Sequence, residues 1–433
     1  MALHRHKSSL EGFLDFSEPF SLTPQQNKAA SGILNKLIED YGLERTGRRG
    51  YMPAMLINAT FEHVHAQSKD AFLNFFILYI HEHLDGNTAE PDISLALAYL
   101  DGFSSFDTDK KSEIRSLVEL FADYMVDNFF TPLRASSVKT PQPTPVSLSS
   151  MQASTPTGIT QRVSILRQSC LIRDHHRCVV SHRFDRKEAQ RRIKQDGIES
   201  KDDDGELLRN EPGEFEYLEV AHILPHSLNS MASGNTELSD SKKNVIQLLT
   251  MFEPGITHLI EGQDIDSPKN ALTLTHHYHR LLGEFEIYFE PIEGAYNRYM
   301  IKSTERDPIL RDRLLPVTRT LSLSPSRTID PPSSRLLKVH RAIALILKLS
   351  GAGEYIENIL RDMEDVKVKE DGSTNLGRLL SLRLGECKLP TDLIPNRGTP
   401  TKARSTEDLQ TLHRFFDDAD LSGRSRRAVF TAL

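Results

Sequence analysis

The chain has few cysteines and no long apolar run. Its 433 residues include only three cysteines, Cys170, Cys178 and Cys387. Three scattered cysteines exclude a disulfide framework and a paired-cysteine zinc module, so we expect reduced thiols. No run reaches 18 apolar residues, and the first twenty residues lack the apolar centre of a secretory signal. The sequence therefore predicts an intracellular protein without a membrane partner, and leaves nucleus and cytoplasm open as compartments.

Positive charge is also in deficit, with a formal net charge of −7. This balance excludes a uniformly basic coat for nucleic acid. Residues 1–130 hold 11 basic and 19 acidic residues, whereas residues 303–433 hold 22 basic and 18 acidic ones. The acidity therefore lies mainly at the front of the chain. Nine of the 17 histidines gather between residues 131 and 302, namely His175, His176, His182, His222, His226, His258, His276, His277 and His279.

The first part of the chain has helical patterns. Thr23-Pro24-Gln25-Gln26 is typical of a capping box with proline at the first helical position, and apolar residues follow at helical spacing until Gly42. Further helical patterns cover residues 53–84, 92–101 and 109–130. We predict an α-helical domain over residues 1–132, which offers a surface for a protein partner.

Composition divides the rest of the chain. Residues 133–160 are rich in Ser, Thr, Pro and Gln, which bury too little apolar surface to offset chain entropy, so they are predicted to be a disordered linker. A second linker is predicted at 303–334, a helical segment at 335–370 and a mostly disordered tail at 371–433.

The segment between the linkers, residues 161–302, differs from the helical front in its pattern of apolar residues. Residues 215–225 alternate as a strand that contains His222, Leu272 and Leu274 suggest a second short strand, and a helix can begin at His276 and end at Gly283. The charged stretch 185–214 is interpreted as a solvated loop. The predicted order is strand, long loop, strand, helix.

Two motifs in this segment carry a family resemblance. LEVAHILP followed by NALTLTHHYH resembles the HNH signature of the ββα-metal nucleases, in the variant common in uncharacterised fungal proteins. The three signature residues fall on His222, Asn270 and His279. The resemblance covers roughly residues 163–302 and implies a central ββα-metal HNH domain. Together with the helical and compositional patterns of the flanks, it predicts an α+β multidomain chain with an α-helical N-terminal domain and a helical, partly disordered C-terminal region. It also implies phosphodiester hydrolysis.

Hydrolysis of a phosphodiester needs a base, a group that orients it and a divalent cation. His222 is assigned as the base. Asn270 is assigned to hold His222 by an amide hydrogen bond, or to accept a hydrogen bond from the loop. His279 is assigned to the metal together with His276, which lies three residues earlier on the same helical face.

Two positions depart from the family pattern. Ala221 and Gly283 stand where many HNH enzymes carry further metal ligands, and Glu219 and Asp266 are weak substitutes. A thin protein shell favours Mg²⁺ or Mn²⁺, which keep several waters, over Zn²⁺.

A dense arginine stretch opens the segment. Arg173, Arg177 and Arg183 are assigned to nucleic-acid binding, with DNA preferred to RNA, because guanidinium groups bind phosphate in bidentate fashion. The competing interpretation is an exposed helix whose charges pair with one another. The predicted function is a divalent-metal-dependent HNH endonuclease. The alternative is a catalytically weak or inactive HNH-fold scaffold or nucleic-acid-binding protein.

Overall fold

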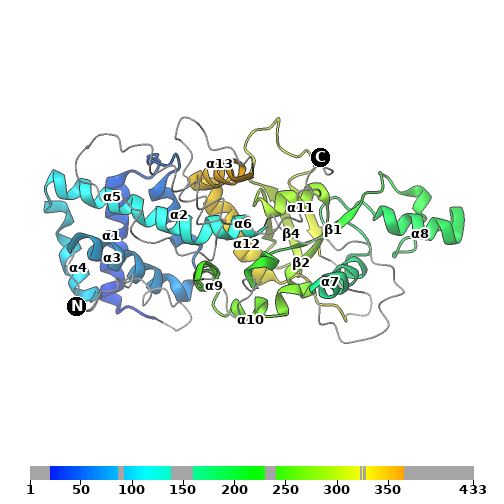
Figure 1. Cartoon of the computed structure of the whole chain (residues 1–433), viewed down its shortest axis with the longest axis horizontal. Helices are drawn as coiled ribbons and strands as arrows, with labels where there is room; N and C mark the ends of the chain where they lie inside the picture. Colours follow the sequence, from blue (N-terminus) through cyan, green and yellow to red (C-terminus); the bar gives the residue numbers. More distant parts are fainter. Residues whose placement is uncertain are drawn as a thin grey trace, which may run out of the picture. The chain divides into compact units, whose positions relative to one another are not determined.

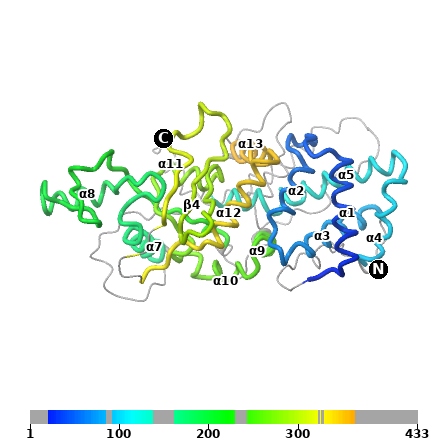
Figure 2. The backbone as a smooth tube through the Cα atoms, turned by 180° about the vertical axis from the view of Figure 1, so that it is seen from behind, coloured from blue at the N-terminus to red at the C-terminus, as the bar shows by residue number. Residues whose placement is uncertain are grey.

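The computed structural model describes residues 20–85, 92–137, 159–229, 240–321, 324 and 328–364. The predicted tail at 371–433 and most of the predicted linker at 133–160 lie outside these ranges. Among the described residues, no helix is both long and apolar enough to cross a membrane. In the part of the chain that the structure describes, helices are combined with two small sheets. Figures 1 and 2 show the backbone from opposite sides.

Helices form the first part of the chain, as the apolar spacing predicts. The predicted capping box is confirmed, because the Thr23 side chain accepts from the Gln26 backbone and the Gln26 side chain accepts from the Thr23 backbone. Phe72, Phe75 and Phe121 make ring contacts in the core between α3 and α5. The elements are α1 (Pro24–Tyr41), α2 (Pro53–His63), α3 (Lys69–Asp85), α4 (Ile93–Asp101), α5 (Thr108–Met125), a π-helical turn (Val126–Phe130) and α6 (Thr131–Ser137).

The centre has the predicted order of strand, loop, strand and helix. After α7 (Ile159–Arg173), β1 (Leu218–His222) pairs antiparallel with β2 (Ala271–Thr275). Leu218 lies opposite Thr275, and His222 lies opposite Ala271. The intervening chain contains α9 (Asp240–Phe252) and α10 (Thr257–Ile260), and α11 (His276–Gly283) packs on both strands.

A second antiparallel sheet follows α11. It consists of β3 (Ile287–Pro291), β4 (Arg298–Ser303) and β5 (Val317–Thr320), with β4 in the middle. The predicted linker at 303–334 is therefore wrong at residues 317–320. The segment is short and becomes a strand through its pairing with β4, in which Val317 lies opposite Ile301. Its β-branched residues favour a strand, but composition does not say which strand it would pair with.

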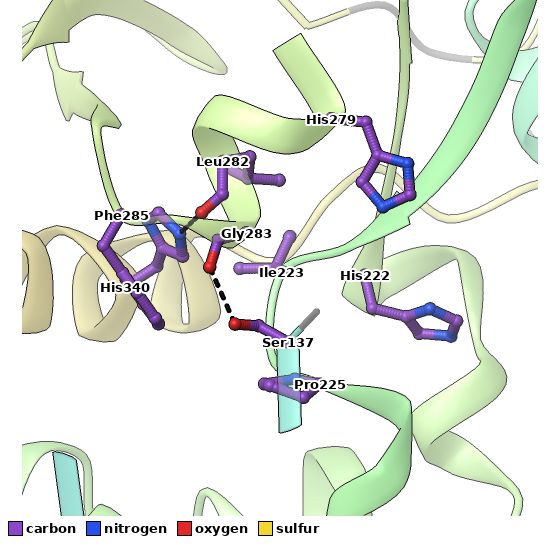
Figure 3. Close-up of a pocket in the computed structure, with 9 residues that line it drawn as sticks. All are labelled: Ser137, His222, Ile223, Pro225, His279, Leu282, Gly283, Phe285 and His340. Carbon is purple, nitrogen blue, oxygen red and sulfur yellow. Dashed lines mark hydrogen bonds between the residues drawn. The ribbon is translucent and has the colours of Figure 1, made fainter. Parts of the chain in front are cut away.

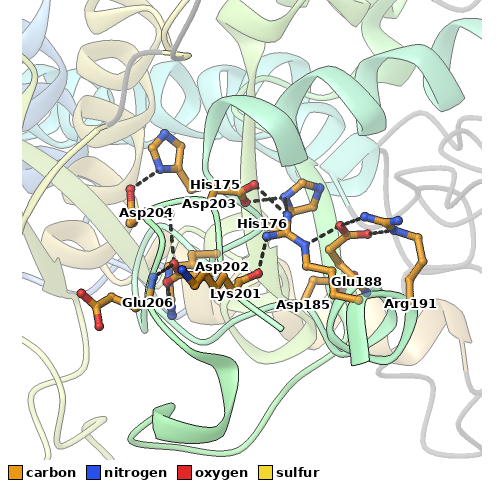
Figure 4. A network of polar contacts seen from close by, with 12 residues as sticks. His175, His176, Asp185, Glu188, Arg191, Lys201, Asp202, Asp203, Asp204 and Glu206 are labelled. Carbon is orange, nitrogen blue, oxygen red and sulfur yellow. Dashed lines mark hydrogen bonds and ion pairs between the residues drawn. The ribbon is translucent and has the colours of Figure 1, made fainter. Parts of the chain in front are cut away.

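The charged stretch 185–214 is not a simple loop, which corrects the sequence-based interpretation. It contains α8 (Arg186–Asp196), whose N-cap Asp185 accepts a hydrogen bond from the Glu188 backbone. Glu188 in turn binds Arg191 and Arg192 at helical spacing. Figure 4 shows that these pairs continue into a network in which His175 contacts Asp204 and His176 contacts Asp203. A cap and paired charges stabilise a helix that has little apolar surface.

The N-terminal helices α1–α6 and the central elements that follow them share one hydrophobic core. Buried residues of the same cluster run from Leu22 to Ile356 and include the two last helices, α12 (Ser334–Ser350) and α13 (Ala352–Glu364). Phe129 stacks on Phe252 with 5.5 Å between ring centroids. The Met52 backbone donates to the Ser350 carbonyl at 2.8 Å. The central sheet is thus packed by elements from both sides of the sequence.

His340 of α12 makes the stability of this core depend on pH. The ring is buried, donates from Nε2 to the Leu282 carbonyl at 3.0 Å and stacks on Phe285. Burial lowers the pKa of His340 from 6.5 to about 4. Between those two values the unfolded chain binds a proton that the native chain does not bind, so stability falls as the pH falls.

We therefore expect His340 to reduce the free energy of unfolding by about 2 kcal/mol at pH 5 relative to pH 7. Urea unfolding of the wild type and of His340→Gln at both pH values measures this term. The variant should lose that part of the pH dependence. An equal change with pH in both proteins would contradict the assignment to His340.

Candidate active site

His222 ends β1 and is held by a carboxylate. Its side chain is only 1% exposed, and Nε2 donates to Oδ1 of Asp266 at 3.2 Å. Nδ1 is buried and has no hydrogen-bond partner among the described residues. Burial lowers the pKa of His222, although Asp266 opposes the shift. The result is a neutral imidazole whose Nδ1 carries a lone pair, which is the state that a general base requires.

Asp266 accepts hydrogen bonds from three side chains: His222, His226 and Arg162. Its Oδ1 also accepts from Nδ1 of His226 at 2.6 Å, and its Oδ2 accepts from Arg162 at 3.2 Å. Burial alone would raise the pKa of Asp266, but the hydrogen bonds from His222 and His226 lower it well below its usual value. Asp266 is therefore an ionised carboxylate in a largely dry setting.

His222, His226 and Asp266 form a potential metal site. Within the described ranges, they are the group of three whose ligand atoms all lie within 4.8 Å of one another. Two imidazoles and one carboxylate are a donor set that suits a transition metal. Sequence reasoning did not select His226 and treated Asp266 as a weak substitute. The available signal was the spacing HILPH, which places the two histidines four residues apart.

Asn270 has a role different from the first one assigned to it. Its buried amide does not bond His222, since Asp266 takes that place. Instead Oδ1 accepts from the Leu224 backbone at 2.9 Å, and Nδ2 donates to the carbonyls of Leu224 and Ile265. This geometry fits the second role expected for Asn270, in which its side chain accepts a hydrogen bond from the loop. Asn270 joins the chain after β1 to the turn that carries Asp266.

His276 and His279 lie together at the start of α11, where the Thr275 side chain caps the helix. Both bind one carboxylate: Glu219 contacts Nδ1 of His279 at 2.6 Å and Nδ1 of His276 at 3.2 Å. The hydrogen bond from His279 is the main cause of a lowered pKa at Glu219. Such a carboxylate fixes the orientation of an imidazole ring.

His222 and His279 line one small cavity, shown in Figure 3. Its volume is about 10 Å³, which is room for about one water. The end of α6 lies at its edge: Ser137 lines the cavity and donates to the Gly283 carbonyl at 2.7 Å, and Ser227 donates to the Ser136 carbonyl at 3.1 Å. Where the family pattern has a further ligand, this chain has a glycine against α6.

The arginines assigned to nucleic acid differ in their surroundings. Arg173 is fully buried and donates to Asp174 and to the carbonyls of Pro268 and Ala271, so it has no exposed donor for phosphate. Its assignment to the interface is corrected for that reason. Arg177 is engaged by Asp202 and Glu211.

Arg183 is the most exposed of the three arginines. Its side chain is 38% exposed, and its shortest ion-pair distance, to Glu216, is 3.9 Å. Its guanidinium lies where a side chain at residue 213 would be, and that residue is glycine. Arg183 is thus the one of the three that stays available to phosphate.

Comparison with known proteins agrees with the geometry of the centre. The family model described as HNH endonuclease matches residues 178–290. This stretch contains His222, Asp266, Asn270 and His279, so the resemblance noted in the sequence is confirmed. No curated protein and no solved structure matches the chain significantly. Residues 178–290 of the chain are therefore similar to the HNH endonuclease family, and the family match does not extend to the helices on either side.

Proposed function

We propose that the protein is a divalent-metal-dependent endonuclease that hydrolyses phosphodiester bonds of nucleic acid, DNA before RNA. The observation that carries the proposal is the buried pair of His222 and Asp266 inside the HNH domain. The hydrogen bond from Nε2 to Asp266 selects the tautomer in which Nδ1 is unprotonated. His222 then accepts a proton from the attacking water, and Asp266 stabilises the imidazolium that results.

The residues present fit a divalent ion. His226 and Asp266 would hold it beside His222, whose buried Nδ1 has no hydrogen-bond partner among the described residues. The ion supplies charge stabilisation at the phosphate and the leaving oxygen when bound. Because imidazole nitrogens suit Mn²⁺ better than Mg²⁺, we expect Mn²⁺ to bind more tightly. The other ligand set, from the sequence, is His276 with His279.

Calorimetric titration with Mn²⁺ separates the two ligand sets. We expect His226→Ala and Asp266→Asn each to weaken Mn²⁺ binding by more than about 10-fold, since loss of even an outer-shell partner costs that much. His276→Ala, at an exposed position of α11, should bind as the wild type does. Loss of binding in His279→Ala, with His226→Ala and Asp266→Asn unaffected, would move the ion to α11.

The small cavity favours a second candidate function, a scaffold or nucleic-acid-binding protein that keeps the fold without useful catalysis. His222 is buried, and the cavity of about 10 Å³ that it lines with His279 is too small for a phosphodiester. The absence of any Mn²⁺ or Mg²⁺ affinity in the wild-type protein would favour this candidate over the nuclease.

A further inference from the structure

An exposed tyrosine with two cations lies at the start of β1. Tyr217 is 55% exposed, although most large aromatic side chains among the described residues are buried. The guanidinium carbon of Arg186 lies 5.9 Å from the ring centroid, and the ammonium nitrogen of Lys187 lies 6.0 Å from it. Both cations are exposed, and within the described ranges neither has a carboxylate at ion-pair distance. We call Tyr217, Arg186 and Lys187 the aromatic platform.

The platform is held in place by one buried carboxylate. Asp185 accepts from the Leu218 backbone through Oδ1 at 3.1 Å and from the Glu188 backbone through Oδ2 at 3.0 Å. The Arg186 backbone also donates to the Glu216 carbonyl at 2.8 Å. The first turn of α8 is therefore fixed to the first residue of β1, so the tyrosine and the two cations are arranged before any ligand binds.

Tyr217 directly precedes β1, and the platform lies toward the two histidines at the start of α11. Side chains of a strand alternate, so Tyr217 shares a face with Glu219, the partner of His276 and His279. Leu218 pairs with Thr275, the residue directly before His276. A ligand stacked on Tyr217 thus extends toward the start of α11.

We propose that the aromatic platform binds a single-stranded segment of nucleic acid, with a base stacked on Tyr217 and flanking phosphates near Arg186 and Lys187. An aromatic face beside unpaired cations satisfies both demands of a single strand, stacking and phosphate neutralisation. In a duplex the base faces are already stacked on one another, so the tyrosine gains little there. The proposal rests on the proposed function only in taking nucleic acid as the substrate.

Fluorescence anisotropy with the full chain tests the platform. The probes are a labelled oligothymidylate of about twelve nucleotides, an abasic oligomer of equal length and charge, and a duplex. With chelator present no metal-dependent cleavage occurs. We expect Tyr217→Ala to weaken binding of the oligothymidylate by roughly 5- to 150-fold, the range for loss of one stacked base, while Tyr217→Phe binds as the wild type does.

Two controls separate stacking from charge. Tyr296→Ala removes a tyrosine between β3 and β4 that is even more exposed than Tyr217, and it should not change binding. Arg186→Ala and Lys187→Ala should weaken the oligothymidylate and the abasic oligomer alike, and each should reduce the salt slope by about one. The same anisotropy measurement with a labelled oligouridylate compares the affinity for single-stranded RNA with the affinity for single-stranded DNA.

Three outcomes would contradict the platform proposal. The wild type binds no single strand, Tyr217→Ala binds the oligothymidylate as tightly as the wild type does, or Tyr217→Ala loses as much affinity for the abasic oligomer or the duplex as for the oligothymidylate. The measurement does not depend on cleavage. If the protein binds single strands through Tyr217 but never cleaves nucleic acid, the nuclease proposal is contradicted and the platform proposal is supported.

Discussion

Replacement of His222 by alanine should reduce metal-dependent plasmid nicking by at least about 100-fold, because general-base catalysis contributes about 10²- to 10⁴-fold. The variant removes the only group at the end of β1 that presents an unprotonated nitrogen in the tautomer set by Asp266. The conversion of supercoiled to open-circular plasmid, with Mn²⁺ and with Mg²⁺, measures the effect.

The matched control is His258→Ala, which removes an exposed histidine of the same domain from α10. It should nick plasmid at the wild-type rate. Far-ultraviolet circular dichroism and binding of the oligothymidylate should be unchanged in both variants. Equal nicking by wild type and His222→Ala after identical purification would show that the activity belongs to a contaminant or to other residues.

The largest effect on stability is expected from Arg173→Met. This change leaves the buried carboxylate of Asp174 without its cation and several carbonyls without a donor, at a cost of about 3–5 kcal/mol in free energy of unfolding. Urea unfolding measures it. Arg183→Met, at an exposed position with a long ion-pair distance, should change stability by less than about 0.5 kcal/mol.

The buried ion pair offers an internal check. If the loss arises from the uncompensated carboxylate, then adding Asp174→Asn to Arg173→Met should recover part of it, although Asp174 also accepts from the Thr273 backbone at 3.2 Å. Similar unfolding of Arg173→Met and the wild type would refute the structural role, and would return Arg173 to the list of phosphate ligands.

Local patterns along the chain predicted the elements that carry the site. The Thr23 capping box, the alternation before His222 and the three-residue spacing of His276 and His279 are properties of a few neighbouring residues. Backbone geometry turns such patterns into helix starts and strand faces with little help from elsewhere. The motif spacing likewise indicated the HNH domain that the family match supports.

Contacts between distant residues followed no such pattern. Asp266 reaches His222 across 44 positions, and the burial of Arg173 depends on turns 95 or more residues away. Strand β5 exists only through β4, and α6 borders the cavity from outside the HNH domain. The sequence by itself determined the ββα elements and their histidines. Only the tertiary structure decided which carboxylate orients each histidine and how far the site is buried, because burial and long-range pairing depend on how loops bring separate segments together.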